Sequence, residues 1–97
     1  MARPLPEASA RQLAEIGKAL ADPTRVQMLH MFKSASAPIC VCDFTAAFGL
    51  SQPTVSHHLS RLRRAGLVSS ARRGIWTFHR LVNPLPAAAQ AVLDLIP

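Results

Sequence analysis

The sequence predicts a mainly helical domain that carries a single β-hairpin. Apolar residues recur at helical spacing along most of the chain, and only residues 67–81 alternate apolar and polar side chains as strands do. The chain has 97 residues, with no internal repeat and no low-complexity linker. We therefore expect one domain over residues 1–97.

The first two predicted helices cover residues 8–21 and 24–35, and Asp22 and Pro23 separate them. Aspartate is a good N-cap, and proline suits the first turn of a helix because its missing N–H is not needed there. Both segments place their apolar residues at helical spacing. We expect a pair of amphipathic helices.

A tight turn joins a third predicted helix, residues 42–48, to a fourth, residues 51–65. Gly49 suits the left-handed conformation that ends a helix, and Ser51 is a good N-cap for the next one. A short helix, a tight turn and a capped helix form a helix-turn-helix.

The spacing of apolar residues changes from helical to alternating after the fourth predicted helix. Residues 67–72 and 75–81 read as two strands joined by a turn at residues 73–74. A last helix over residues 86–96 is apolar on most faces, which suits a dimer interface. The predicted fold class is a winged helix-turn-helix, in the order α-α-α-α-β-β-α, that forms a homodimer.

Charge is distributed unevenly along the chain. The net charge is +6, and the segment from residue 51 to 82 contains six arginines and no acidic residue. Such a block favours a polyanionic partner such as double-stranded DNA, although a solvated basic face has the same composition. A protein that packages DNA without sequence preference is a further alternative.

No apolar run reaches the length of about 18 residues that spans a membrane. The first residues also lack the apolar core of a signal peptide. We therefore expect a cytoplasmic protein with no membrane partner.

The fourth helix carries the predicted DNA-reading surface. Val55, Leu59 and Leu62 form its apolar stripe, and the opposite face is polar. Hydroxyl, amide and imidazole groups near a helix N-terminus suit base edges and phosphates. The predicted DNA-binding residues are Ser51, Gln52, Thr54, Ser56, His57 and Arg61 in this helix, with Arg72 and Arg73 at the hairpin tip.

Two other residues of this region have structural interpretations. His58 lies close to the apolar stripe, so we expect it to support the helix and not to read bases. Trp76 lies on the hairpin, where we expect a packing role.

The two cysteines, Cys40 and Cys42, are one residue apart. In a reducing compartment such a pair favours a metal or redox site over a structural disulfide. We expect the dipole at the start of the third helix to lower the pKa of both thiols. Residues i and i+2 of a regular helix point about 200° apart, so one ion would reach both thiols only if the helix start unwound.

The sequence resembles the ArsR/SmtB family of winged-helix metalloregulators. The resemblance rests on ICVCDFTAAFGLSQPTVSHHLSRLRRAGLV, on the arginine-tipped hairpin and on HRLVNP, and it extends back to ALADPTR at residues 19–25. It implies a homodimeric repressor that leaves its operator when it binds an inducer. It also implies that Gln52, Thr54, Ser56 and His57 correspond to the family's recognition-helix contacts.

The resemblance also indicates the inducer. In the arsenic-responsive repressors a third thiol follows three residues after the second, where this chain has Thr45. Cadmium- and lead-responsive relatives complete the site from an N-terminal arm, and residues 1–12 contain no cysteine or histidine. The second family site lies on the last helix, where only Asp94 is a candidate ligand.

We therefore predict release by As(III), with Sb(III) second, at Cys40 and Cys42. The alternatives are a cadmium- or lead-sensing repressor, a thiol-based redox sensor and a thiol pair that only packs. Enzymatic activity is not expected, because the chain shows no nucleophile–base–acid set and C-x-C is not the C-x-x-C of thiol oxidoreductases.

Overall fold

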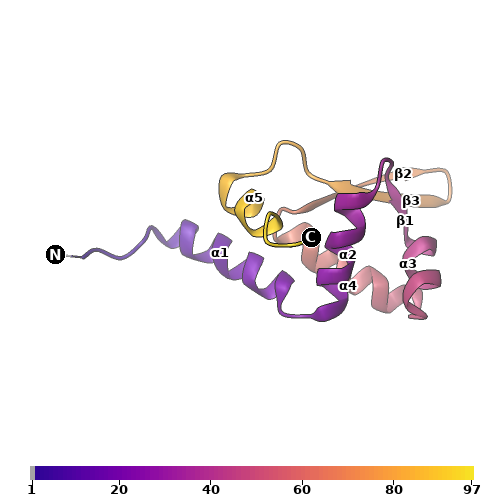
Figure 1. Ribbon diagram of the computed structural model, residues 1–97, viewed down its shortest axis with the longest axis horizontal. Helices are drawn as coiled ribbons and strands as arrows, with labels where there is room; N and C mark the ends of the chain where they lie inside the picture. The colour runs from indigo at the N-terminus through magenta and orange to yellow at the C-terminus, as the bar shows by residue number, and fades with distance from the viewer. Residues whose placement is uncertain (1) are drawn as a thin grey trace.

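The computed structural model describes residues 2–97. Its elements are α1 (Glu7–Leu20), α2 (Pro23–Ser34), β1 (Ile39–Cys40), α3 (Val41–Phe48), α4 (Gln52–Arg64), β2 (Val68–Arg73), β3 (Trp76–Leu81) and α5 (Ala87–Leu93). In Figure 1, α1 and α5 lie at one end of the molecule, and α3 and the tip of the β2–β3 hairpin lie at the other. Within the described range, no helix combines the length and apolarity needed to cross a membrane.

The predicted order of helices and hairpin is confirmed, but the sheet has a third strand that we did not predict. β1 pairs antiparallel with β3, so that Ile39 lies opposite His79 and Cys40 opposite Phe78. The strand order is therefore β1-β3-β2. A strand of two residues is too short to produce an alternating pattern, so the sequence carries no signal for it.

The predicted helix ends are formed by the expected residues. The Asp22 carboxylate accepts hydrogen bonds from the backbone N–H groups of Thr24 (2.8 Å) and Arg25 (3.3 Å) at the start of α2. Gly49 ends α3 with φ 64°, a left-handed conformation that a side chain would disfavour. These two caps separate α1 from α2 and α3 from α4.

The last helix is shorter than the predicted residues 86–96. Lys33 of α2 lies at its end, where its ammonium group donates hydrogen bonds to the backbone carbonyls of Leu93 (2.7 Å) and Ile96. Both of these residues are buried against the core of the same chain. The role of α5 in a dimer interface stays a prediction.

Phe44 fixes the position of α3 in the core. Its side chain is fully buried, and its ring lies 5.3 Å from that of Phe32 of α2 in an edge-on arrangement. The Phe44 ring also stacks on that of Phe48 of the same helix, with the ring centroids 6.2 Å apart. α3 also packs against α4, and Phe44 belongs to the same buried core as Val55 and Leu59 of α4.

Replacing Phe44 with alanine should lower the free energy of unfolding by about 3–5 kcal/mol, because the change leaves a large cavity in the core. Urea unfolding followed by circular dichroism, at one protein concentration, would measure the loss. Phe48→Ala is the matched control, since that ring is only half-buried and its removal should cost less. An equal loss in the two variants would contradict the central role of Phe44.

Candidate DNA-binding surface and thiol site

The two faces of α4 are separated as the sequence predicts. Val55, Leu59 and Leu62 are fully buried. Of the predicted DNA-binding residues, Arg61 is half-buried and the others are exposed, namely Ser51, Gln52, Thr54, Ser56, His57, Arg72 and Arg73. The structure therefore places these polar residues on the surface of α4, next to its N-terminus, and on the hairpin.

Two of the predicted contacts bond to each other. The Ser51 hydroxyl donates a hydrogen bond to Thr54 Oγ1 (2.9 Å) and accepts one from the backbone N–H of Thr54 (3.4 Å). Ser51 is thereby confirmed as the N-cap of α4. Among the described residues, the side chains of Gln52, Ser56 and His57 make no recorded hydrogen bond, so they are the groups available to a partner on this face.

Arg64 also belongs to this surface, although we did not predict it. It lies in the last turn of α4 and is exposed. It follows His57 by seven residues, which is two helical turns, so both lie on the same side of the helix. The spacing of seven residues is the signal that could have identified it.

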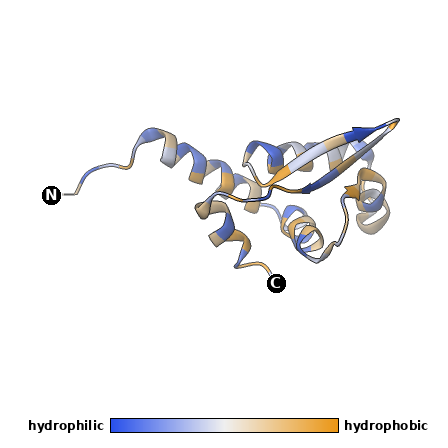
Figure 2. Cartoon of the chain, turned by 90° about the horizontal axis from the view of Figure 1, so that it is seen from above, coloured by the Kyte–Doolittle hydropathy of each residue, from blue (hydrophilic) through white to orange (hydrophobic). Residues whose placement is uncertain are grey.

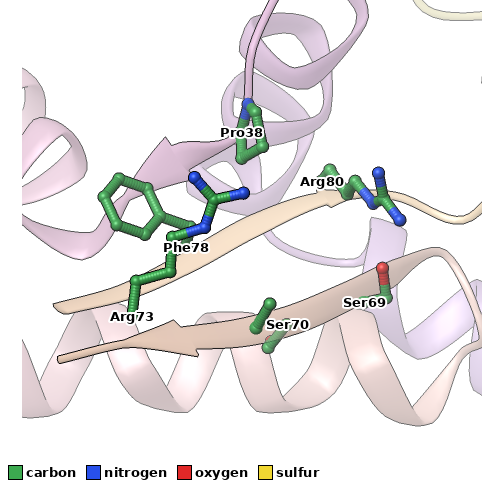
Figure 3. A pocket seen from close by; sticks show the side chains of 7 residues that line it. Pro38, Ser69, Ser70, Arg73, Phe78 and Arg80 are labelled. Atoms are coloured by element: carbon green, nitrogen blue, oxygen red, sulfur yellow. The ribbon is translucent and has the colours of Figure 1, made fainter.

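The hairpin arginines lie on opposite faces of the sheet, because neighbouring residues of a strand alternate. Arg73 shares its face with Arg80 and Phe78, and together with Pro38 these residues line a hollow of about 360 Å³ (Figure 3). Arg72, on the other face, donates a hydrogen bond from Nε to the carbonyl of Gly74 (3.2 Å).

Within residues 2–97, the basic surface has no acidic partner. The salt bridges found between residues 2 and 97 both lie within α1, where Arg11 pairs with Glu7 and Lys18 with Glu15. The arginines of α4 and the hairpin are therefore not neutralised by this part of the chain. A surface with this charge attracts a polyanion.

His58 supports α4 from the buried side, as we predicted. Its Nδ1 lies 3.0 Å from Nη1 of Arg25. The other nitrogens of the same guanidinium group donate hydrogen bonds to the carbonyls of Ala19 (Nε, 2.9 Å) and Lys18 (Nη2, 2.8 Å) at the end of α1. Arginine has no acceptor, so Nδ1 of His58 must be unprotonated. Burial lowers the pKa of His58 and so favours this neutral form, although Asp22 acts in the opposite direction.

A second polar chain connects α4 to the wing. Arg63 donates a hydrogen bond to Ser70 Oγ (3.2 Å), and that hydroxyl lies 2.7 Å from Nδ1 of His79. His79 is 2% exposed. Burial lowers the pKa of His79 to about 4, and the positive charge of Arg63 acts in the same direction. The histidine is therefore neutral at pH 7.

The two thiols lie side by side at the start of α3. Cys40 Sγ and Cys42 Sγ are 2.6 Å apart. Cys40 is the N-cap residue, with an extended backbone (φ −79°, ψ 150°), and only Cys42 is inside the helix. The expectation that the helix must unwind before both thiols face one ion is therefore wrong, since the angle of about 200° applies only within a helix.

The thiol sulfur of Cys40 has a structural role as well. It accepts a hydrogen bond from the backbone N–H of Cys42 (3.4 Å), and the Asp43 carboxylate accepts one from the backbone N–H of Cys40 (3.0 Å). The two bonds form a capping box at the start of α3. An ion that binds this sulfur would compete with the cap.

The expected lowering of the thiol pKa is not found for Cys42. The hydrogen bond that its thiol donates to Cys40 Sγ raises the pKa of Cys42. Loss of hydration and the nearby charges of Cys40 and Asp43 act in the same direction. These contacts outweigh the effect of the helix dipole on which the prediction rested.

A cavity of about 280 Å³ adjoins the thiol pair. Its lining residues come from three elements that meet at this end of the molecule. They are Cys40, Val41, Cys42 and Thr45 at the start of α3, Gln52 at the start of α4, and Ile75, Trp76 and Thr77 at the hairpin tip. The thiols therefore share one cavity with the predicted DNA-reading helix and with the wing.

Trp76 is not the packing residue that we predicted. It is 52% exposed, and Ile75 beside it is 82% exposed. The hairpin accordingly ends in a hydrophobic tip next to a hydrophilic stretch, as Figure 2 shows. A hairpin tip has no core beneath it, and a sequence pattern does not reveal that Trp76 lies so far from the core.

The ligand count at the thiol pair is low. In the part of the chain that the structure describes, no three His, Cys, Asp or Glu side chains are grouped so that they could hold a metal ion. A structural zinc or cadmium site normally has four protein ligands. The chain thus brings two sulfurs to this site.

The helix-turn-helix, the hairpin wing and the basic surface define a winged-helix protein of the DNA-binding class. Residues 22–70 match the model of a family described as bacterial regulatory protein, arsR family. The chain belongs to the ArsR family. Its relatives are transcriptional regulators and not enzymes, in agreement with the prediction.

The similarity extends beyond the helix-turn-helix. The chain is 41% identical over 76 residues to the arsenic resistance transcriptional regulator ArsR1 of Pseudomonas putida, which covers 78% of this chain and 59% of that protein. It is 38% identical over 80 residues to the arsenical resistance operon repressor of Escherichia coli K12. That match covers 82% of this chain and 68% of the repressor.

A solved structure shares the fold. The homodimeric winged helix-turn-helix DNA-binding domain of a Mycobacterium bovis protein matches with a TM-score of 0.71 at 30% identity, over 99% of this chain and 83% of that one. Other sequence relatives have names that do not refer to arsenic, among them KmtR of Mycobacterium tuberculosis and an SmtB homologue of Synechocystis. Family membership alone therefore leaves the inducer open.

Acid should destabilise the fold through His79. The folded protein holds the pKa of His79 at about 4, below the ordinary value of 6.5, so the unfolded chain binds more protons between these values. Stability should fall as the pH falls from 6.5 to about 4, by about 2–3 kcal/mol in total. Urea unfolding across this range would measure it. In His79→Gln the free energy of unfolding should depend less on pH over this range. The same pH dependence in both proteins would mean that His79 is not its source.

Proposed function

We propose that this chain is a homodimeric transcriptional repressor that binds operator DNA and is released by As(III), or by Sb(III), at Cys40 and Cys42. One observation carries the proposal. The two sulfurs lie 2.6 Å apart at the start of α3, and the cavity beside them reaches Gln52, the first residue of α4. A ligand of the thiols would therefore lie next to the helix proposed to read DNA.

The proposed DNA contacts divide by position. Gln52, Ser56 and His57 are exposed near the N-terminus of α4, where polar side chains suit the base edges of a major groove. Arg61 and Arg64 of α4, with Arg72 and Arg73 of the hairpin, suit the phosphate backbone. Ser51 and Thr54 shape the helix start through their mutual hydrogen bonds.

Release follows from the position of Cys40. Its sulfur caps α3 and its backbone pairs with Phe78 of the wing, so an ion that binds it acts on both elements at once. Loss of the cap weakens the first turn of α3, which packs on α4, and Phe44 of α3 lies in the core that the two helices share. The reading helix and the wing then no longer match the spacing of the DNA grooves. By linkage, bound DNA must weaken inducer binding by the same factor.

The ligand count supports arsenic and antimony. Thiolates select thiophilic ions over hard ions such as Mg²⁺. Trivalent arsenic takes three ligands, so two protein thiols and one external group complete it. Four-coordinate cadmium or zinc would need further ligating side chains. Among the described residues, no third His, Cys, Asp or Glu is grouped with the two thiols.

A thiol-based redox switch is the second candidate, and the same sulfur contact favours it. Two thiols 2.6 Å apart are placed for oxidation to a disulfide. A disulfide between residues i and i+2 is strained and therefore easily reduced. Peroxide that releases DNA from the reduced protein, when arsenite does not, would support this function instead.

Replacing His57 with alanine should weaken binding to the operator by about 1–3 kcal/mol and leave binding to random DNA nearly unchanged, because a base contact is lost. Fluorescence anisotropy with both DNAs, at one salt concentration, would measure the difference. Arg64→Ala is the control, since the loss of a phosphate contact should weaken both complexes equally. Equal losses in His57→Ala would mean that this side chain does not read bases.

Changing both cysteines to serine should leave operator binding within about twofold of the original and abolish release by arsenite. Serine keeps a capping oxygen at residue 40 but provides no thiolate. Anisotropy of labelled operator DNA, titrated with arsenite under reducing conditions and with cadmium and zinc in parallel, would test this. Arsenite release that persists in the double variant would place the inducer site elsewhere.

A further inference from the structure

The tip of the β2–β3 hairpin ends in two exposed apolar side chains. Arg73 pairs with Trp76 across the strands, so only Gly74 and Ile75 form the turn. Gly74 has φ 61°, a conformation that the first position of a two-residue hairpin turn requires. Ile75 lies at the apex and is 82% exposed, and Trp76 next to it is 52% exposed. Turns normally carry small or polar residues, so turn formation does not explain an isoleucine at the apex.

Phosphate binding does not explain the apolar tip either. Arg72 and Arg73 flank the turn on opposite faces of the sheet, so they are placed to reach the phosphates on the two sides of a groove. Isoleucine has no hydrogen-bonding group, and the indole of Trp76 has a single donor. The hairpin therefore ends in an apolar apex between two cations, and the apex needs a role that charge does not supply.

The hairpin tip lies beside the start of the helix proposed to read DNA. Ile75 and Trp76 line the same cavity as Gln52, the first residue of α4. The tip also forms one extremity of the molecule in both views (Figures 1 and 2), so a duplex can approach it without meeting other elements. A duplex whose major groove receives the start of α4 therefore presents its next minor groove to the tip.

We propose that Ile75, with Trp76 beside it, inserts between two base pairs in that minor groove and bends the operator there. This inference rests on the proposed function and concerns the shape that the DNA takes when bound. Apolar side chains that enter the minor groove partly unstack one base step and kink the duplex. Burial of Ile75 and Trp76 offsets the cost of unstacking. The β-branched side chain of Ile75 is also stiff, so it loses little conformational freedom on insertion.

An insertion of this kind selects DNA sequence without hydrogen bonds to bases. Steps such as TA unstack and kink readily, whereas runs of A·T pairs in one orientation are stiff. We therefore expect the operator to require a flexible step at a fixed distance from the bases that α4 contacts. Replacing a TA step at that place with AA should weaken binding about fivefold or more. This preference depends on Ile75 and not on His57.

The experiment uses the reduced full chain bound to a labelled duplex from its own promoter region. Permanganate oxidises thymines that have lost their stacking, so a reactive thymine should appear on the flank of each half-site. Energy transfer between dyes at the two ends of the duplex should report a bend of about 20–90°. Trp76 is the single tryptophan of the chain, and its fluorescence should be quenched as it approaches the bases.

Ile75→Ser removes the apolar apex with little risk to the fold, because residue 75 is 82% exposed and serine suits a turn. This variant should lose the reactive thymine and the bend, and it should bind duplexes with TA and AA steps equally well. Ile75→Leu is the matched control, since it keeps an apolar side chain of similar size and should retain all three properties. His57→Ala should bind more weakly but keep the reactive thymine.

The outcomes separate this inference from the proposed function. If the chain does not bind the duplex, the proposed function fails and this inference fails with it. If the chain binds the duplex tightly while no thymine becomes reactive and the DNA stays straight, only the insertion is overturned. Equal reactivity and equal bending with Ile75→Ser would overturn it as well, because other residues would then deform the DNA. Trp76 fluorescence that changes with protein concentration in the absence of DNA would instead show that a second copy covers the tip.

Discussion

The pairing of β1 with β3 is the constraint on which the rest of the site depends. Only Ile39 and Cys40 form this strand, but they attach the start of α3 to the middle of the wing. Without that attachment, the hairpin tip and the helix-turn-helix would be connected mainly through the end of α4. The pairing brings the thiols, the first residue of α4 and Trp76 to one cavity. A ligand bound to the thiols would therefore lie next to both α4 and the wing, the two elements proposed to contact DNA.

Cys40 combines three tasks that compete for the same atoms. Its backbone belongs to the sheet, its sulfur caps α3, and the same sulfur is a proposed ligand. A serine cap would hold the helix more firmly, because sulfur is a weak acceptor. The weaker cap is consistent with a sensor, since an N-cap contributes only about 0.5–2 kcal/mol and a thiophilic ligand can readily displace it.

Polar contacts on both sides fix the orientation of α4. Arg25 connects His58 to the end of α1, and Arg63 connects to His79 through Ser70. Both contacts involve histidines whose pKa is lowered by burial, so both are intact at neutral pH. The polar residues on the exposed side of α4 are therefore held in a fixed orientation. A surface that reads bases requires such an orientation.

The sequence by itself determined the order of helices and hairpin, the caps at Asp22 and Ser51, and the polar face of α4, because these depend on local spacing and on residue type. Only the tertiary structure decided how the thiols meet. Sequence reasoning put Cys40 at or just before the start of the third helix and expected that helix start to unwind before one ion could reach both thiols. In the structure a strand too short to show a period holds Cys40 outside the helix, with its sulfur already beside that of Cys42. The exposure of Trp76 and its place beside the thiols likewise depend on contacts between segments far apart in the chain, which no local pattern records.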